Sequence, residues 1–509
     1  MKLVDDILKE IEKDMRSAKH TVSMKNVGYV TEVKDEVVFI DGLTDSPYGE
    51  LITFQGGIQG MVVDLLEESV GAIVFGDYTT IHEGDEVIGS GDVFKVPVSD
   101  AYLGRVVNGI AQPIDAKGVI KATSFQFIDP LAPGVIAREP VSVPVQTGIK
   151  AVDALIPIGR GQRELIIGDR RTGKTTIALD AILNQKGQDM ICIYCAIGQR
   201  RANTAAVAKL LQDRGAMEYT IIVSASASDS AAMQYVAPYV ATTLGEHFMN
   251  QGKDVLVVYD DLTKHAWAYR QVSLILRRPA GREAYPGDIF YVHSRLLERA
   301  CRLNADNGGG SLTSLPIIET QEGDLSAYIP TNVISITDGQ IFLEADLFNA
   351  GIRPAINVGA SVSRVGSSAQ TKAMKSVAKT LKSDLAQYRE LAAFAQFESE
   401  LDEATKKLID RGVRMTQLLK QGKNVPYTLA QQVVAFWFGG KGYLDVLHPH
   451  EVTQCEAQLL EHVATSHQDI YETIQEKRVV DEDLDKKLTR IADAFMKTHF
   501  PDRSEVAKL

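Results

Sequence analysis

The sequence predicts a multidomain α/β protein, with a small N-terminal β-barrel, a central α/β domain on a mostly parallel sheet, and a C-terminal helical bundle. Three successive patterns along the chain support this prediction. Short β-rich runs punctuated by Gly and Asp come first, strands that alternate with helices follow, and only helical patterns remain after about residue 370. The expected boundaries are 1–23 for an N-terminal helix, 24–96 for the barrel, 97–370 for the central domain and 371–509 for the helical domain.

Composition and charge narrow the possible functions. The chain has 509 residues, 45% of them hydrophobic and 24% charged, as in an ordinary globular protein of about three domains. Its net charge of −12 argues against nucleic acid as the main partner, because phosphate backbones are bound by basic surfaces. No apolar run reaches the roughly 18 residues that a bilayer-spanning helix needs. Four cysteines in a chain of this length favour a reducing compartment.

The first predicted element is a short amphipathic helix at residues 3–18. Its apolar positions fall on one face: Val4, Ile7, Leu8, Ile11 and Met15. This face serves either a partner or the chain's own fold, and the pattern alone does not separate the two. The many acidic residues of the segment argue against a signal peptide and against an Arg-rich transit peptide.

The barrel is predicted from seven short runs between Gly28 and Val96. Gly and Asp punctuate these β-rich runs, which is typical of strands joined by tight turns. They cover residues 29–33, 37–40, 51–54, 61–65, 72–75, 86–88 and 94–96. Many short strands at close spacing indicate a small barrel or sandwich.

The central domain contains the most specific motif of the chain, a phosphate-binding loop with the spacing G-x-x-x-x-G-K-[ST] after the apolar run 165–167. The motif is Gly168-Asp169-Arg170-Arg171-Thr172-Gly173-Lys174-Thr175. Its glycines allow a tight turn, so that backbone N–H groups face phosphate oxygens. Lys174 is expected to reach the outer phosphates, and the Thr175 hydroxyl to ligate Mg²⁺. Thr176 is predicted to bind nucleotide with the loop. The apolar positions Ile177, Ala178, Ala181 and Ile182 then recur at helical spacing and predict a helix, whose N-terminus also favours anions.

Further apolar runs are predicted as strands of the same sheet, because helical stretches separate them. They cover residues 190–197, 220–223, 255–259 and 333–336, and the glycine-rich stretch 307–311 is predicted to be a flexible loop. Cys192 and Cys195 form a C-x-x-C within an apolar strand pattern, whereas a redox pair is expected at a helix N-terminus. The two cysteines are therefore predicted to be buried strand residues.

Two strand ends complete the predicted site. The run 255–259 ends in Asp260-Asp261, and in P-loop folds an aspartate at such a position holds Mg²⁺ beside the loop hydroxyl. Asp260 is favoured over Asp261 because it is nearer the strand. The run 190–197 leads to Gln199, where hydrolysis would require a carboxylate. An amide can hold a water molecule but cannot take its proton.

The C-terminal region is predicted to be entirely helical, because its patterns have helical spacing and its strand signals end. Helices are expected at 373–389, 398–419, 429–436 and 452–475. Gly422, Pro426, the pair Gly439-Gly440 and Pro449 are expected to divide them.

Together these motifs resemble the alpha subunits of F-type ATP synthases over nearly the whole chain. The P-loop, the segment 196–199 and the aspartate pair are similar to that family. Longer similar stretches cover residues 276–288, 290–299, 330–339 and 351–356. Arg171 and Lys423 stand where the family usually has Gln, and with the short N-terminal helix they indicate a divergent branch.

The resemblance implies a RecA-like central domain that binds ATP or ADP with Mg²⁺ and turns it over little. The position of Gln199 corresponds to the essential Glu of the catalytic beta subunit. Arg353-Pro354, Gln421 and Lys423 are implied to wall the adenine pocket. The segment 361–366 resembles a loop that extends an arginine, here Arg364, toward the nucleotide of the neighbouring beta subunit.

The family also implies partners. The chain would alternate with beta subunits in a ring, with its loop 285–288 against a central gamma stalk and its N-terminal helix on delta and the peripheral stalk. A membrane rotor sector that transports H⁺ or Na⁺ would be coupled indirectly. The implied location is the cytoplasmic face of a bacterial plasma membrane, with the stromal face of the thylakoid as the alternative.

Two other functions compete with this interpretation. A self-sufficient P-loop motor, such as a secretion ATPase, requires a catalytic carboxylate after Gly198, and Gln199 argues against it. A RecA-like or Rho-like nucleic-acid translocase requires a basic surface with aromatic side chains, which disagrees with the acidic composition.

Overall fold

The computed structural model describes residues 26–395 and 402–501. The predicted helix at 3–18 lies outside the described residues. The chain divides into two compact units between Phe94 and Lys95, and each unit has its own hydrophobic core.

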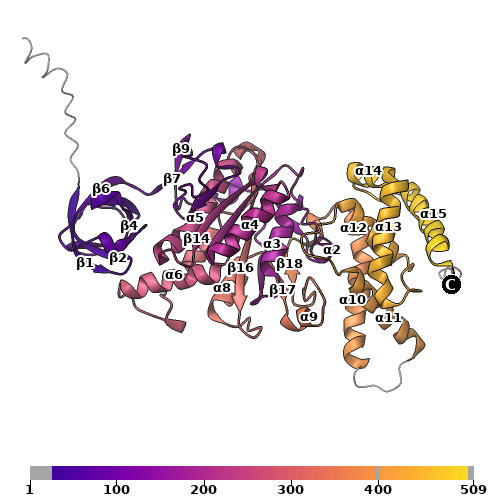
Figure 1. Ribbon diagram of the computed structural model, residues 1–509. Helices are drawn as coiled ribbons and strands as arrows, with labels where there is room; N and C mark the ends of the chain where they lie inside the picture. The colour runs from indigo at the N-terminus through magenta and orange to yellow at the C-terminus, as the bar shows by residue number, and fades with distance from the viewer. Residues whose placement is uncertain (1–25, 396–401, 502–509) are drawn as a thin grey trace, which may run out of the picture. The chain divides into compact units, whose positions relative to one another are not determined.

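The first unit is a closed antiparallel barrel with the strand order β1-β2-β5-β4-β3-β6 (Figure 1). The strands are β1 (Val27–Lys34), β2 (Val37–Gly42), β3 (Glu50–Phe54), β4 (Gln59–Leu65), β5 (Ser69–Val74) and β6 (Glu86–Val93). Apolar side chains such as Val30, Ile40 and Ile52 fill the interior, because alternate strand residues point inward. The predicted barrel is therefore confirmed.

The seventh predicted run, 94–96, does not join the barrel. It lies mostly in β7 (Lys95–Val98), which pairs with β9 (Ser124–Phe127) in the second unit. The reason is topological: pairing of β1 with β6 closes the barrel, and a closed sheet has no edge left for another strand.

The second unit is built around an eight-stranded sheet with the order β18-β17-β12-β16-β15-β13-β14-β8, parallel except for the β17–β18 pair. Its strands are β8 (Val106–Asn108), β12 (Leu165–Asp169), β13 (Met190–Gln199), β14 (Thr220–Ser226), β15 (Asp254–Asp260), β16 (Ser311–Thr320), β17 (Gly339–Leu343) and β18 (Val362–Ser363). A separate small sheet pairs β10 (Pro144–Val145) with β11 (Ile158–Gly159). Cys192 and Cys195 are buried and free in β13, as predicted.

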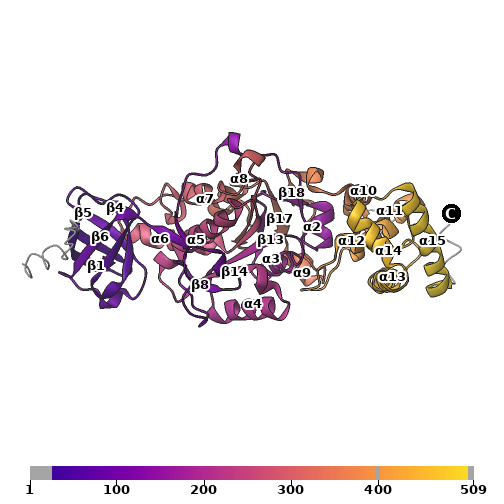
Figure 2. The same ribbon diagram turned by 90° about the horizontal axis from the view of Figure 1, so that it is seen from above.

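Helices cover both faces of this sheet (Figure 2). They are α2 (Lys150–Leu155), α3 (Lys174–Leu183), α4 (Arg201–Asp213), α5 (Ala231–Met249), α6 (Leu262–Ile275), α7 (Ile289–Leu297), α8 (Tyr328–Ile336) and α9 (Ala345–Asn349). One face packs on α3 and α4, and α5, α7 and α8 lie on the other side in Figure 2. The predicted α/β domain is thus confirmed, with the phosphate-binding loop between a central strand and a covered helix.

The prediction of a strand at 333–336 was wrong, because these residues end α8. Ile329, Val333 and Ile336 are buried at helical spacing, which outweighs the β-branched composition of the run. The strand that was missed is β16, whose Ser, Thr and Pro residues interrupt its apolar pattern although the strand is almost wholly buried.

The C-terminal region is helical, as predicted. Its helices are α10 (Lys372–Ala395), α11 (Glu403–Leu418), α12 (Leu429–Gly440), α13 (Val452–Ser466), α14 (Gln468–Lys477) and α15 (Glu482–His499). Their apolar faces join the same core as α3, α4 and one face of the sheet. No helix in the described ranges is both long and apolar enough to cross a membrane.

Three details of this region differ from prediction. Gly439 and Gly440 are the last two residues of α12 rather than lying outside the helix, and a Cβ on Gly439 would be 2.9 Å from the Leu418 side chain, so the glycine allows this close packing. The predicted helix 452–475 is broken at His467, whose ψ of 41° is not helical. The helix α15 was not predicted, although Asp481 caps its N-terminus.

Candidate nucleotide-binding site

The phosphate-binding loop joins β12 to α3 at the carboxyl end of the parallel sheet. Two of its glycines are required by geometry. A Cβ on Gly168 would lie 2.4 Å from the Leu343 carbonyl oxygen, and Gly173 has a φ of 103°. Arg171, with an exposed side chain, also has a positive φ of 63°. The turn leads directly into the first N–H groups of α3, which lack intrahelical partners and therefore favour anions.

Lys174 lies across this loop. Its Nζ donates to the carbonyl oxygens of Gly168 at 2.8 Å and Asp169 at 2.6 Å, and the side chain is buried. Burial lowers the pKa of Lys174, and the surrounding carboxylates, Glu319 first, oppose that shift. The ammonium is thus held among acceptors at the loop, which is the position from which a P-loop lysine contacts phosphate.

Asp260 is the centre of a hydrogen-bonded cluster beside the loop. Its Oδ2 accepts from the Thr175 hydroxyl at 2.7 Å and from the Tyr194 hydroxyl at 2.8 Å, while Oδ1 accepts from Gln199 Nε2 at 2.9 Å. The hydroxyl of Thr175 and the carboxylate of Asp260 are hard oxygen donors of the kind that Mg²⁺ prefers. The residues therefore fit the predicted magnesium site.

Tyr194 was missed by the sequence analysis. It lies within β13, on the same face as Ala196. The signal that could have found it is its phenol hydroxyl, a polar group in an otherwise apolar strand. Burial, followed by the charge of Asp260, raises the pKa of Tyr194, so the hydroxyl remains a donor.

Asp261 has a different role from Asp260. Its Oδ1 accepts from the Lys264 backbone N–H at 2.9 Å and caps α6, and its Oδ2 pairs with the Lys264 ammonium. Burial raises the pKa of Asp261 to about 6, and Lys264 opposes that shift. The preference for Asp260 as the metal-site carboxylate thus agrees with this geometry.

Glu319 is a second carboxylate that the sequence analysis missed, because it belongs to the unpredicted β16. It pairs with the Arg170 guanidinium, and its backbone N–H donates to the Thr263 hydroxyl at 2.9 Å. Among the described residues, each acidic side chain at the phosphate end of the cleft is therefore already engaged by a donor.

The cleft has a volume of about 1070 Å³. It brings together most of the predicted nucleotide-site residues: Arg170, Arg171, Thr172, Gly173, Lys174, Thr175, Thr176, Gln199, Asp260, Arg353, Pro354, Gln421 and Lys423. Gly168 and Asp169 do not line it, because their carbonyls face Lys174 and the Asp169 carboxylate accepts from Thr320 and Gly323. Arg353 stacks over the ring of Phe348 at 4.3 Å, which stiffens the end of the cleft remote from the loop.

The segment between α11 and α12 closes that remote end. Gln421 Oε1 accepts from the Lys150 N–H at 3.0 Å, and its Nε2 donates to the Gly148 carbonyl at 2.8 Å. Asn424 N–H donates to Asp180 on α3 at 2.8 Å. Lys423 is exposed beside them. The helical domain is thereby attached directly to the helix that follows the phosphate-binding loop.

Arg364 does not line this cleft. It follows β18, which pairs with the first residues of β17, and its N–H donates to the Asp338 carbonyl at 2.9 Å. Because Leu165 pairs with Gln340, Arg364 lies beside the amino end of β12, opposite to the phosphate-binding loop. Its side chain is exposed.

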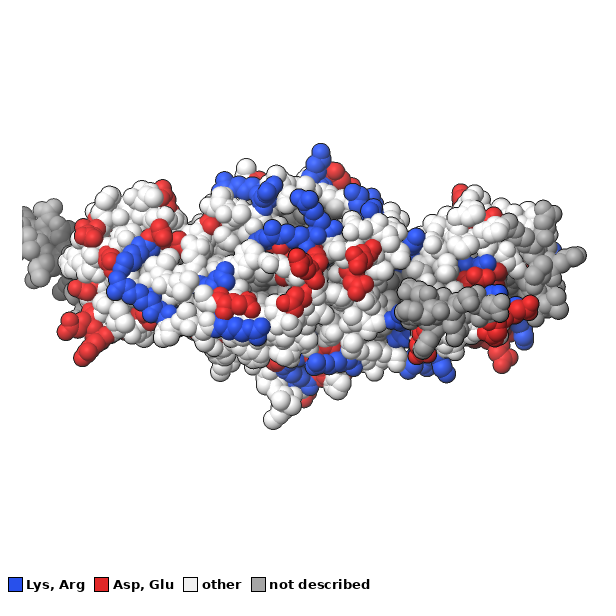
Figure 3. Space-filling model, turned by 90° about the horizontal axis from the view of Figure 1, so that it is seen from below, with Lys and Arg blue, Asp and Glu red and all other residues white. Residues whose placement is uncertain are grey.

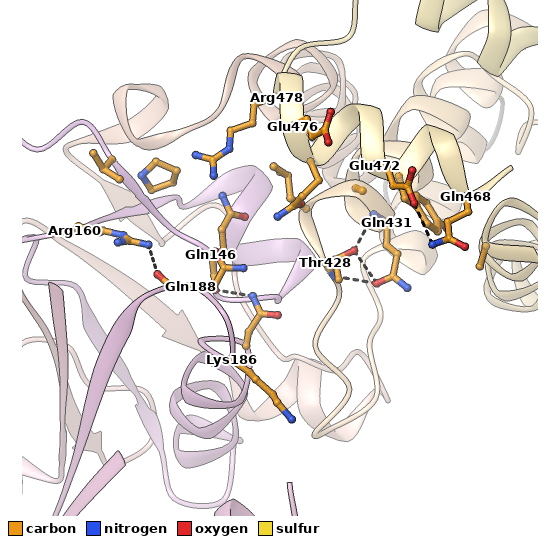
Figure 4. A pocket seen from close by; sticks show the side chains of 18 residues that line it. Gln146, Arg160, Lys186, Gln188, Thr428, Gln431, Gln468, Glu472, Glu476 and Arg478 are labelled. Atoms are coloured by element: carbon orange, nitrogen blue, oxygen red, sulfur yellow. Dashed lines mark hydrogen bonds between the residues drawn. The ribbon is translucent and has the colours of Figure 1, made fainter. Parts of the chain in front are cut away.

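A second hollow of about 730 Å³ lies between the sheet domain and the helices (Figure 4). Its wall mixes amides such as Gln146 and Gln431 with charged and apolar side chains, and none of the predicted site residues line it. On the face of the second unit drawn in Figure 3, Lys and Arg lie beside Asp and Glu rather than in a continuous basic stripe. This mixture does not favour the nucleic-acid interpretation.

Comparison with known families covers most of the chain. The family model of the ATP synthase alpha/beta nucleotide-binding domain matches residues 148–363. The C-terminal domain model of the ATP synthase alpha/beta chain matches 370–495, and the beta-barrel domain model of the family matches 23–91.

Curated relatives are similar over nearly the full length. ATP synthase subunit alpha of Dehalococcoides mccartyi is 56% identical over 493 residues, which are 97% of this chain and 98% of that protein. The protein of the same name from Syntrophomonas wolfei is 56% identical over 479 residues, 94% of this chain and 95% of that protein.

Proposed function

Because the chain belongs to the alpha subunits of the F-type ATP synthase family, we propose that it is the regulatory, non-catalytic nucleotide-binding subunit of an ion-translocating ATP synthase. In this role it binds ATP or ADP with Mg²⁺ in its own cleft and hydrolyses it little. Its chemical contribution is made to the catalytic site of the neighbouring beta subunit.

The observation that carries this proposal is Gln199. It lies at the end of β13, within 2.9 Å of Asp260, where a water-activating carboxylate would be required. The other acids of the phosphate end cannot replace it. Asp260 accepts three hydrogen bonds, Asp261 pairs with Lys264, and Glu319 pairs with Arg170. A bound nucleotide would thus meet anchoring groups without a free base.

The proposed contribution to the neighbour comes from Arg364. A guanidinium is always charged and can form a fork of hydrogen bonds to phosphoryl oxygens. The exposure of Arg364 and its place at the amino end of β12 support a role outside the chain's own cleft.

The proposed assembly follows from this division of work. The chain alternates with beta subunits, contacts the gamma stalk through the loop 285–288, and reaches delta and the peripheral stalk through residues 3–18. The complex couples ATP synthesis or hydrolysis to H⁺ or Na⁺ transport, as a peripheral assembly on the cytoplasmic face of a bacterial plasma membrane or, alternatively, the stromal face of the thylakoid.

The test is to purify the chain alone and to measure nucleotide affinity, ATPase activity and oligomeric state. We expect a monomer that binds ATP and Mg²⁺ and shows little turnover. A homo-oligomer with brisk turnover would contradict the proposal and would favour a self-sufficient motor such as a secretion ATPase.

A further inference from the structure

Glu164, a buried carboxyl at the amino end of the sheet, has an unused oxygen. Its side chain is 0% exposed and lies just before β12. Oε2 accepts from Gln162 Nε2 at 2.7 Å, whereas Oε1 has no hydrogen-bond partner among the described residues. A buried oxygen without a partner is costly, so such an atom needs a physical explanation.

The surroundings place this carboxyl against the strand that carries Arg364. A Cβ on Gly339 would lie 2.5 Å from Oε2 and 2.9 Å from Oε1, so the backbone of β17 rests directly on the carboxyl. Gly339 pairs with Ser363, the residue before Arg364. Gln162 Nε2, which holds Oε2, also donates to the Ser363 hydroxyl at 3.3 Å. Glu164 and Arg364 therefore flank the same short stretch of β17.

Among the charged side chains of this region, Arg364 is the donor that remains available to Glu164. Asp338 is already committed to Arg163, whose Nε and Nη2 donate to its two oxygens at 3.0 and 2.9 Å. No side-chain hydrogen bond or ion pair within the described ranges engages Arg364. Burial, and then the charge of Asp338, raises the pKa of Glu164, while the Gln162 hydrogen bond and the charge of Arg364 lower it. The Gln162 amide and the nearby Arg364 charge thus both favour ionised Glu164.

We propose that Glu164 is the positioning residue for Arg364 in the assembled ring: Oε1, which has no partner in the isolated chain, there accepts one edge of the guanidinium while the other edge faces the nucleotide of the neighbouring subunit. A guanidinium has five N–H donors in a rigid plane, so it can bridge two acceptors at once. A group held in this way keeps its orientation at the moment of reaction. The inference rests on the proposed role of Arg364 in the neighbouring site.

The test uses Glu164→Gln in the assembled complex with the catalytic partner. Gln keeps the shape and removes the charge, and its amide nitrogen can no longer accept. We expect about a tenfold fall in turnover, because a small loss of alignment is costly in catalysis, with nucleotide affinity at both kinds of site unchanged within twofold. Glu164→Asp keeps the charge and should retain more turnover than Glu164→Gln, whereas a pure packing role would give the opposite order.

Glu50 provides a matched control in the barrel. It is 1% exposed, Oε1 accepts from Gly91 N–H at 2.6 Å, and Oε2 has no partner among the described residues. A Cβ on Gly89 would lie 2.7 Å from Oε1, so a glycine backbone packs against this carboxyl as Gly339 packs against Glu164. Glu50→Gln should leave turnover unchanged.

A double-mutant cycle with Arg364→Ala separates the outcomes. If Glu164 acts through Arg364, Glu164→Gln adds nothing in the Arg364→Ala background. Normal turnover in Glu164→Gln, or a loss that adds in full to that of Arg364→Ala, would overturn the positioning role and leave the proposed function standing. Normal turnover in Arg364→Ala would overturn both. If Glu164→Gln does not assemble, the same cycle is run with Glu164→Asp.

Discussion

The two ends of strand β12 are built on opposite plans. At the carboxyl end, Lys174 and Asp260 are each held by two or more hydrogen bonds within the chain. At the amino end, Glu164 keeps an unused oxygen, and Arg364 is exposed. This difference indicates that the site for the chain's own ligand is the one whose polar side chains are already hydrogen-bonded within the chain. The groups at the amino end keep bonding capacity that the isolated chain does not use.

The largest expected effect tests the amino end. Arg364→Ala, reconstituted with the catalytic partner, should lower steady-state turnover by roughly 10³–10⁵, as for arginines that stabilise phosphoryl charge. Nucleotide affinity should fall much less, because the contact strengthens in the transition state. Arg364→Lys should rescue poorly, since an ammonium lacks the planar fork. If weaker nucleotide binding to the alpha cleft explained the whole loss of turnover, Arg364 would belong to the same site as Lys174, and the comparison would fail.

A smaller effect on turnover is expected when a carboxylate is introduced at the carboxyl end of β12, where a general base is missing. Gln199→Glu should produce slow hydrolysis at the alpha site, near the lower limit of the roughly 10²–10⁴ that a general base contributes. The new carboxylate would face Asp260 without the present hydrogen bond, so like-charge repulsion limits the gain. Single-turnover hydrolysis with beta sites inactivated measures it. Rapid turnover at the wild-type alpha site would contradict the premise that this site lacks a general base.

Lys174→Ala should change the carboxyl end alone. Removal of the ammonium should weaken nucleotide binding to the isolated chain by roughly 10- to 100-fold, in line with about 1.5–3 kcal/mol for a hydrogen bond to a charged group. Titration with a fluorescent ATP analogue measures this loss. Arg364→Ala is the matched control and should bind normally. Equal affinities for wild type and Lys174→Ala would refute the assignment of the loop.

The smallest effect concerns pH. Burial raises the pKa of Asp180, which lines the cleft, from 3.8 to about 6. The folded state therefore binds this proton more tightly than the unfolded state, so the group's contribution to stability is full below about pH 4 and is lost as pH rises through 6. The loss is at most about 3 kcal/mol. Calorimetry of the isolated chain should show a shallower decline between pH 4 and 6 for Asp180→Asn, and parallel curves would contradict this.

Residue patterns predicted the barrel, the phosphate-binding loop and the pairing of Thr175 with Asp260, because each depends on local spacing. They failed where burial overrides composition. The strand β16 has polar residues among its apolar ones yet is almost wholly buried, and the residues 333–336 have strand composition yet end a helix. Tyr194 and Glu319 were missed because their roles depend on neighbouring strands rather than on any motif. The role of Arg364 came only from resemblance, since a lone exposed arginine has no signal of its own.

The core shared by the sheet face and the C-terminal helices has a mechanical consequence. Close-packed interiors are stiff and transmit strain, and this core runs without interruption from Ile166 and Ile177 to Val433 and Phe495. The ion pair between Lys150 and Glu456, at 2.6 Å and fully buried, reinforces the joint. A force applied at α15 is therefore transmitted through the core to α3, the helix that follows the phosphate-binding loop. A nucleotide bound in the cleft would in turn resist movement of α3 and of the helices packed against it.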